Sequence, residues 1–147
     1  VFGKYDKFDL NKSHVIGATL KKVFNAEFED NIEIWGSGRA RRDFIYIDDL
    51  IDMIEKCIIN QDEIYGLYNC GIGFSISINE LVEKIIKISD KKLTMRNNIS
   101  KPDIPTALSL NCEKAFKEIG WKVNTSLEDG LKYTYDWLCE NSKNDLL

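Results

Sequence analysis

Residues 35–49 bring together side chains that could bind an anion. Gly36 and Gly38 follow an apolar stretch that ends at Trp35, and three arginines occupy positions 39, 41 and 42. Glycine adopts backbone dihedrals that other residues avoid, and guanidinium groups bind phosphate oxygens two at a time. This pattern indicates a phosphate-binding turn, although the charges alone fit a solvated turn equally well.

His14 is the single histidine of the chain. Imidazole is the side chain whose ordinary pKa lies nearest neutral pH, and a general acid placed at a helix start could donate a proton to a substrate. A structural or surface role is the alternative, because a lone histidine more often has one. Its position at the start of a predicted helix therefore makes His14 a candidate general acid.

Gly71-Ile72-Gly73 invites comparison with a dinucleotide-binding loop. Ile76 stands where the third glycine of that fingerprint belongs, so we predict an ordinary turn. The four cysteines lie far apart, without the close pairs of a zinc site. We expect reduced, mostly buried thiols and no bound metal.

The composition limits the possible functions. The 147 residues fit a single globular domain, and the formal net charge of −4 argues against a nucleic-acid partner. No apolar run reaches the length of a membrane span, so we expect a cytoplasmic protein without a membrane partner. The chain starts at Val1 without a methionine, and we expect it to be an excerpt from a longer protein.

Helical and strand patterns alternate along the chain and predict an α/β architecture. Apolar residues at three- and four-residue spacing predict helices over 13–27, 50–59, 78–89 and 126–140, and a short helix between Asn111 and Gly120. Shorter apolar stretches predict strands over 32–35, 43–47, 67–70 and 93–95, and another that ends near Phe2. We expect the tail, residues 141–147, to fray.

Helix-capping residues are predicted at each helix start: Ser13, Asp48 or Asp49, Ser77 with Glu80, Asn111, and Ser126 with Asp129. In the second helix we expect the apolar residues to face the core: Leu50, Ile51, Ile54, Cys57 and Ile58. These helices would position the histidine and the glycine–arginine turn.

The order of the motifs resembles the extended short-chain dehydrogenase/reductases, the NAD-dependent epimerase/dehydratase family. The stretch Ser13-His14-Val15-Ile16 resembles its GDP-L-fucose synthase branch. Shared with many sugar-nucleotide epimerases are Trp35-Gly36-Ser37-Gly38, the stretch from Arg42 to Asp49, Tyr68-Asn69-Cys70-Gly71, and the ending that runs from Gly120-Trp121 to Leu131. The likeness covers essentially the whole chain.

This resemblance implies roles for individual residues. It makes His14 the general acid in epimerisation and reduction of GDP-4-keto-6-deoxy-mannose. It also implies that the nucleotide sugar is bound by Ser13, Lys22, Trp35, Arg42 and Lys101. The family's loop after Lys101-Pro102-Asp103 ends in a basic pair, whereas Thr106-Ala107-Leu108 stand here. Another NAD-dependent sugar-nucleotide epimerase or dehydratase is therefore an alternative.

The resemblance also implies the domain organisation. Residues 1–147 would be a single C-terminal, Rossmann-like fragment, mainly the small mixed α/β substrate-binding domain. It would keep the last elements of the nucleotide-binding domain (about 43–73), while the N-terminal NAD(P)-binding domain is absent. NADP would bind in the full-length enzyme, a homodimer, and the fragment alone would be inactive. A non-catalytic binding module or a gene fragment is the remaining alternative.

Overall fold

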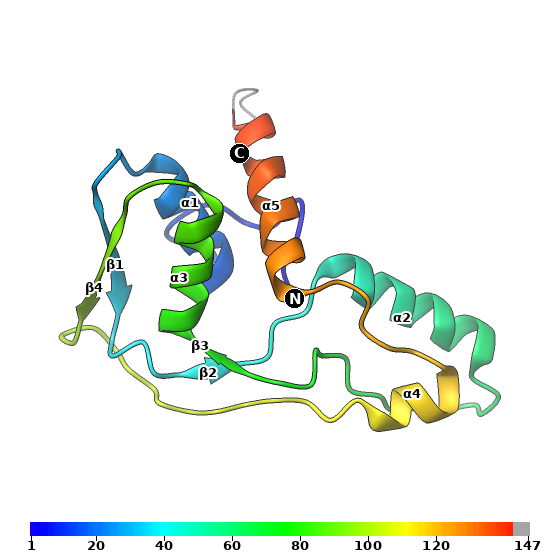
Figure 1. Cartoon of the computed structure of the whole chain (residues 1–147). Helices are drawn as coiled ribbons and strands as arrows, with labels where there is room; N and C mark the ends of the chain where they lie inside the picture. The colour runs from blue at the N-terminus through cyan, green and yellow to red at the C-terminus, as the bar shows by residue number, and fades with distance from the viewer. Residues whose placement is uncertain (143–147) are drawn as a thin grey trace.

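The computed structural model describes residues 1–142, and Figure 1 shows helices on both sides of short strands. Two strands, β1 (Asn31–Trp35) and β4 (Thr94–Asn98), pair in parallel, with Trp35 opposite Asn98. A shorter antiparallel pair joins β2 (Arg41–Arg42) to β3 (Ile76–Ser77). The fold is mixed α/β, as the alternating patterns predicted.

The larger core lies among α1 (Val15–Asn25), α3 (Ile78–Ile88) and α5 (Leu127–Asn141), which pack against one another. Side chains on the inner face of each helix are fully buried there, including Leu20, Leu81 and Leu138. In β1 only Ile32 and Ile34 are buried, which leaves one face of the strand exposed. The alternation puts Trp35 on that exposed face.

A smaller core joins α2 (Ile47–Asn60) to α4 (Glu113–Ile119) on the other side of the molecule (Figure 1). Met53 and Trp121 are buried in it, together with Ala115 and Ile119 of α4. The chain crosses between the two cores through the extended segments around β2 and β3. The residues that form the candidate site lie on these crossing segments.

Three sequence-predicted helix ends are confirmed. Ser77 and Glu80 form a capping box at the start of α3, and Ser126 accepts the Asp129 N–H at the start of α5. Gly120 ends α4 with a positive φ of 68°. Each device joins residues only a few positions apart, so the sequence is sufficient to specify it.

Three predicted caps are wrong. His14, rather than Ser13, is the N-cap of α1, and the Ser13 hydroxyl donates to the Asp9 carbonyl. Tyr46 precedes α2, so that Asp48 and Asp49 lie inside its first turn. Cys112 precedes α4, while the predicted cap Asn111 accepts the N–H of Glu113.

Two predicted strands, 43–47 and 67–70, are wrong. A third, the strand predicted to end near Phe2, pairs through a single bridge. Residues 43–46 form no strand beyond one bridge of Tyr46 to Phe2, and helix α2 begins directly afterwards at Ile47. The stretch 67–70 is extended but unpaired within residues 1–142. Local β-propensity therefore identified extended backbone, whereas pairing depends on a neighbouring strand.

The inner face of α2 was also predicted incorrectly. Ile51, Ile54 and Ile58 are 47%, 51% and 79% exposed, and Met53 is buried in their place. Helix α2 packs on α4 through its other side, so that its isoleucine face has no covering element within residues 1–142. The periodicity identified the apolar face, but the part of the protein shown here does not bury it.

None of the helices within residues 1–142 is both long and apolar enough to cross a membrane. Helix α5 ends at Asn141, and the rest of the tail predicted to fray, residues 143–147, lies outside the described part of the chain.

Candidate functional site

The glycine–arginine turn connects β1 to β2. Gly36 and Gly38 have φ values of 71° and 69°, a left-handed conformation that favours glycine. A Cβ on Gly36 would lie 2.7 Å from Asp103, and one on Gly38 would overlap the Asn79 side chain. The turn therefore needs both glycines, for backbone conformation and for space.

A second segment, residues 98–108, runs beside this turn. The Gly36 N–H donates to the Asn98 carbonyl at 2.9 Å, and the Ser37 N–H donates to the Asp103 carboxylate at 2.9 Å. Further along, the Arg41 N–H donates to the Thr106 carbonyl at 2.8 Å. Together residues 35–42 and 98–108 form one surface, which we call the cradle.

Trp35 and Lys101 meet on the cradle. The Lys101 ammonium lies 5.1 Å from the centre of the Trp35 ring, which is a cation–π contact. Trp35 is 59% exposed, so the other face of its ring is open to solvent. Two residues predicted separately to bind the nucleotide sugar are thus brought together from distant parts of the sequence.

Arg42 also belongs to the cradle. Its Nη1 donates to the carbonyls of Arg41 and Thr106, both at 2.8 Å. Its Nη2 makes no hydrogen bond to any residue between 1 and 142, and so remains able to bind an anion. Two carbonyl contacts hold the guanidinium group at the surface of the cradle.

Asp103 balances part of the positive charge of the cradle. Hydrogen bonds from Ser37, with a contribution from the nearby Arg39, lower the pKa of the Asp103 carboxyl. The carboxylate is therefore ionised at neutral pH and fixes the turn to the second segment. Arg39 itself is exposed, so its guanidinium group faces solvent.

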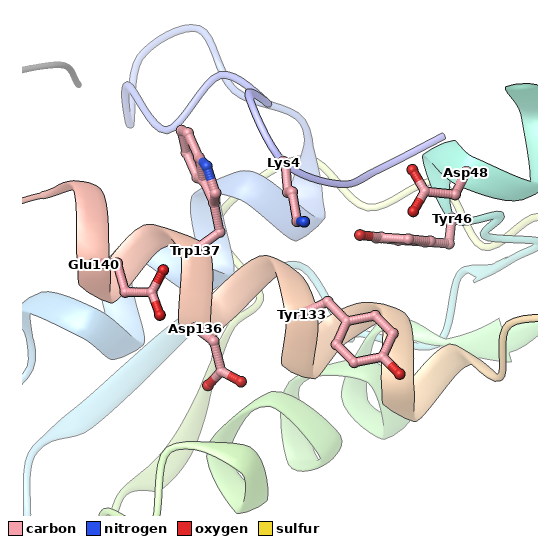
Figure 2. A pocket seen from close by; sticks show the side chains of 7 residues that line it. All are labelled: Lys4, Tyr46, Asp48, Tyr133, Asp136, Trp137 and Glu140. Atoms are coloured by element: carbon pink, nitrogen blue, oxygen red, sulfur yellow. The ribbon is translucent and has the colours of Figure 1, made fainter.

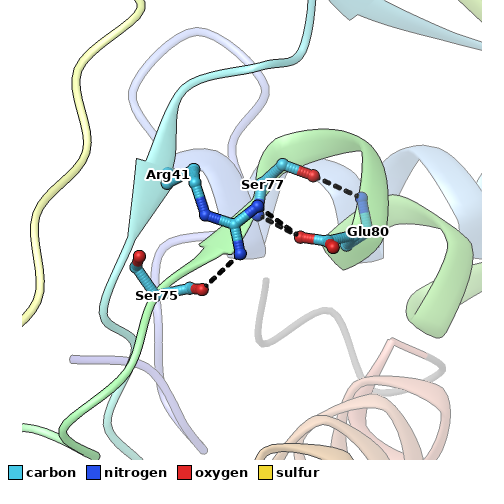
Figure 3. A network of polar contacts seen from close by, with 4 residues as sticks. All are labelled: Arg41, Ser75, Ser77 and Glu80. Carbon is cyan, nitrogen blue, oxygen red and sulfur yellow. Dashed lines mark hydrogen bonds and ion pairs between the residues drawn. The ribbon is translucent and has the colours of Figure 1, made fainter.

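Arg41 has a structural role (Figure 3). Its Nη2 donates to the Ser75 carbonyl at 2.6 Å, and its Nη1 lies 3.1 Å from the Glu80 carboxylate in an ion pair. The same carboxylate accepts the Ser77 N–H at 2.6 Å. Arg41 thus connects β2 to the start of α3.

His14 and Ser13 lie at the N-terminal end of α1. His14 is exposed, and its imidazole does not cap the helix. Helix α1 leads through a short connection into β1 and packs on it, so its N-terminus lies at the end of this layer where β1 stops. Within residues 1–142, no hydrogen bond joins His14 to Trp35 or Arg42.

Lys22 lies away from the other predicted site residues. Its ammonium group donates to the Glu33 carbonyl of β1 at 2.9 Å. Helix α1, which carries it, packs on the larger core, whereas Trp35 lies on the exposed face of β1. In the described part of the chain, Lys22 joins helix to strand and makes no contact of this kind with Trp35 or Arg42.

Asp43 organises the loops beside Arg42, a structural role that sequence reasoning missed. Its carboxylate accepts the N–H groups of Ile72 at 2.8 Å, Gly73 at 3.1 Å and Leu110 at 3.1 Å. It therefore fixes two distant loops directly beside Arg42. The sequence signal was the acid Asp43 directly after Arg42, at the end of the glycine–arginine turn. Because residues 43–47 were predicted to form a strand, Asp43 was given no role of its own.

The cradle offers two kinds of chemistry, ring stacking on Trp35 and charge-assisted hydrogen bonds from Arg42 and Lys101. This set suits an aromatic base or sugar face next to a diphosphate. The Gly71–Gly73 turn is closed by Asp43, as described above, so it presents no phosphate-binding loop. Within residues 1–142 no cluster of three metal-binding side chains occurs.

Comparison with known proteins identifies the class. The model of the NAD dependent epimerase/dehydratase family matches residues 1–71. Residues 1–71 of the chain match this family, and the chain has the Rossmann-like, mixed α/β fold of extended short-chain dehydrogenase/reductases. The resemblance that the motifs carried is thereby confirmed.

Particular relatives narrow this class. The chain is 37% identical to the GDP-L-colitose synthase of Yersinia pseudotuberculosis, with 99% of this chain and 47% of that protein covered. It is 36% identical to the GDP-L-fucose synthase of Sinorhizobium fredii, with 96% and 45% covered. The GDP-mannoheptose C4 reductase MlghC of Campylobacter jejuni, solved with NADP bound, superposes with a TM-score of 0.74 at 26% identity, covering 94% of this chain and 50% of that one. The chain spans about half the length of the curated relatives it matches.

Proposed function

We propose that this chain is the nucleotide-sugar-binding part of a GDP-sugar epimerase/reductase. The observation that carries the proposal is the cradle, in which Trp35, Lys101 and Arg42 share one surface assembled from two distant segments. A GDP-sugar would place its diphosphate against Arg42 and Lys101. The names of the relatives, which include GDP-L-fucose and GDP-L-colitose synthases, support the same substrate class.

For the complete enzyme we propose epimerisation and NADPH-dependent reduction of GDP-4-keto-6-deoxy-mannose, with His14 as general acid. The exposed imidazole at the N-terminus of α1 is free to donate a proton to a carbon of the sugar. In this proposal Ser13, just before α1, and Lys22, on α1, support substrate binding. A His14→Gln variant of the complete enzyme should bind the substrate but lose exchange of sugar protons in deuterated water. Unchanged exchange would contradict the role.

A second substrate is favoured by one observation. Ala107 and Leu108 replace the basic pair of the fucose synthase loop, and Leu108 is 54% exposed beside the cradle. An apolar side chain here would contact a less polar part of the ligand than a basic residue would. Another NAD-dependent sugar-nucleotide epimerase or dehydratase is therefore the alternative function.

We also propose that residues 1–3 and about 43–73 are the last elements of the nucleotide-binding domain. The Phe2–Tyr46 bridge is a fragment of a parallel sheet, and the isoleucine face of α2 is exposed beside it. Both features suit elements that complete a larger sheet. NADP would bind mainly to the rest of that domain, and a cytoplasmic homodimer of the complete enzyme stays a prediction.

Calorimetric titration with GDP-mannose tests the cradle. Arg42→Ala should weaken the dissociation constant about tenfold or more, as expected for a charge-assisted hydrogen bond of about 1.5–3 kcal/mol. Arg42→Lys should recover only part of the affinity, because an ammonium lacks the planar fork of donors. The matched control is Arg96→Ala on β4, outside the cradle, which should leave affinity unchanged. Equal dissociation constants for Arg42→Ala and the unaltered chain would refute the proposal.

A further inference from the structure

A pocket of about 370 Å³ opens between α5, the start of α2 and the N-terminal segment (Figure 2). None of its lining residues belongs to the cradle, and two of them, Tyr46 and Asp48, lie in the segment proposed above as the last part of the nucleotide-binding domain. Seven residues line the pocket: Lys4, Tyr46, Asp48, Tyr133, Asp136, Trp137 and Glu140.

Aromatic rings form the walls of this pocket. On one side Tyr46 meets Tyr133 edge-on, with ring centres 6.0 Å apart. On the other side Trp137 is packed by Tyr5 at 4.8 Å and stacks on Phe8 at 5.9 Å. These contacts hold the rings in place, so that they present fixed surfaces to a ligand.

Carboxylates outnumber cations among the lining residues. Three carboxylates, Asp48, Asp136 and Glu140, line the pocket together with a single lysine, Lys4. Asp136 already accepts a hydrogen bond from Lys132 at 2.8 Å. No ion pair within residues 1–142 occupies Asp48 or Glu140, so the pocket carries uncompensated negative charge.

The Tyr46 hydroxyl is the second feature that points to a ligand. Tyr46 is only 3% exposed, yet its hydroxyl has no hydrogen-bond partner within residues 1–142. Figure 2 shows the ring directed into the pocket from the start of α2. The hydroxyl is therefore free to accept a hydrogen bond from a bound donor.

We propose that this pocket binds an organic cation, a guanidinium or alkylammonium group. The aromatic faces of Tyr133 and Trp137 attract a cation through their ring electrons. Its N–H donors would be accepted by the Tyr46 hydroxyl and by the unpaired carboxylates of Asp48 and Glu140. The cation comes either from a small free molecule or from an arginine side chain of a polypeptide.

Titration of the 147-residue chain with agmatine, followed by NMR, tests this proposal. The reporter is the indole N–H resonance of Trp137, assigned by comparison with Trp137→Phe. Agmatine should shift it in a saturable manner, whereas butylurea, which is neutral, should not. A blocked Gly-Arg-Gly peptide distinguishes the sources: tighter binding than agmatine indicates a polypeptide side chain, and weaker binding indicates a free small molecule.

Single substitutions locate the binding and its charge preference. Glu140→Gln should weaken agmatine binding about threefold or more, while Glu83→Gln, the same change on the exposed side of α3, should have no effect. Lys4→Met should strengthen binding about threefold, because it removes the one cation of the pocket. Tyr46→Phe should weaken binding without a large loss of stability, since the hydroxyl has no partner to lose.

Three results would overturn the proposal. They are the absence of a saturable shift at about 10 mM agmatine, which corresponds to a negligible affinity; an equal response to butylurea; or weaker agmatine binding in Lys4→Met, which would contradict attraction of the cation by the net negative charge of the pocket.

Discussion

The Trp121 indole N–H donates to the backbone carbonyl of Asp49 at 3.0 Å. The carboxylate of the same aspartate accepts the N–H groups of Asn124 at 2.8 Å and Thr125 at 3.2 Å. Asp49 is 2% exposed, so the start of α2 is fixed in the interior to the loop that leads into α5. The second acid of the Asp48-Asp49 pair thus connects two parts of the fold instead of capping its own helix.

Replacing Asp49 with alanine should lower the free energy of unfolding by about 2–4 kcal/mol, because two part-buried N–H groups lose a buried, charged acceptor. Urea denaturation followed by circular dichroism measures the change. Asp48→Ala is the matched control, since this neighbouring side chain is exposed; it should cost about 0.5 kcal/mol through the helix dipole. Equal losses for the two variants would contradict the buried role of Asp49.

Gly38→Ala should destabilise the chain more than Gly120→Ala. Both glycines have similar positive φ values, 69° and 68°, so the backbone cost is shared. A Cβ on Gly38 would overlap Asn79, whereas one on Gly120 has no atom within 4 Å. We expect about 1 kcal/mol for Gly120→Ala and a further 1–3 kcal/mol, roughly, for Gly38→Ala through overpacking. Thermal unfolding of both variants gives the comparison.

Lys91 should stabilise the end of α1. Its ammonium group donates to the carbonyls of Val23, Phe24 and Ala26 at 2.7–2.9 Å. Lys91→Met should therefore cost about 1–2 kcal/mol, because these carbonyls lose a charged donor at a helix C-terminus. Lys92→Met, next to it, should cost less, since Lys92 makes only a cation–π contact with Phe28. Hydrogen exchange of the last turn of α1 would show whether the loss is local.

The capping box of α3 should become weaker in acid. Hydrogen bonds from Ser77, with the Arg41 charge, lower the Glu80 pKa below its ordinary value of 4.5. A lowered pKa in the folded state means stability that is present above pH 4.5 and is lost as the pH falls through the folded-state pKa. Unfolding temperatures of Glu80→Gln and the unaltered chain should therefore differ most near pH 7 and converge as the pH falls through the folded-state pKa of Glu80. Glu83→Gln is the control on the same helix.

Sequence reasoning predicted the helices well and the strands poorly. The apolar stripes of α1, α3 and α5 are buried as expected, because each stripe faces the larger core. The stretches 43–47 and 67–70 have strand-like composition, but no neighbouring strand pairs along them within residues 1–142. The exposed isoleucines of α2 have the same physical origin, since a pattern shows which face is apolar and not what covers it.

In the candidate site too, the sequence predicted some features, and others depend on tertiary contacts. The sequence identified Trp35, Arg42 and Lys101 through their resemblance to family motifs, but nothing in their spacing placed Lys101 over the Trp35 ring. The resemblance favoured Arg42 over Arg41, but nothing in their spacing showed that Arg41 pairs with Glu80. Asp43 was missed because its partners, the loops at 72–73 and 110, are distant in the sequence.

The sequence by itself determined the local features of this protein: the capping box at Ser77, the Ser126 cap, the positive-φ glycines of the turn, and the glycine that ends α4. Each depends on atoms within a few residues of one another, whose geometry the chain fixes directly. Only the tertiary structure decided the role of each arginine, the contact between Trp35 and Lys101, and the buried connection from Asp49 to the loop before α5. Those depend on segments that meet only when the whole chain is packed.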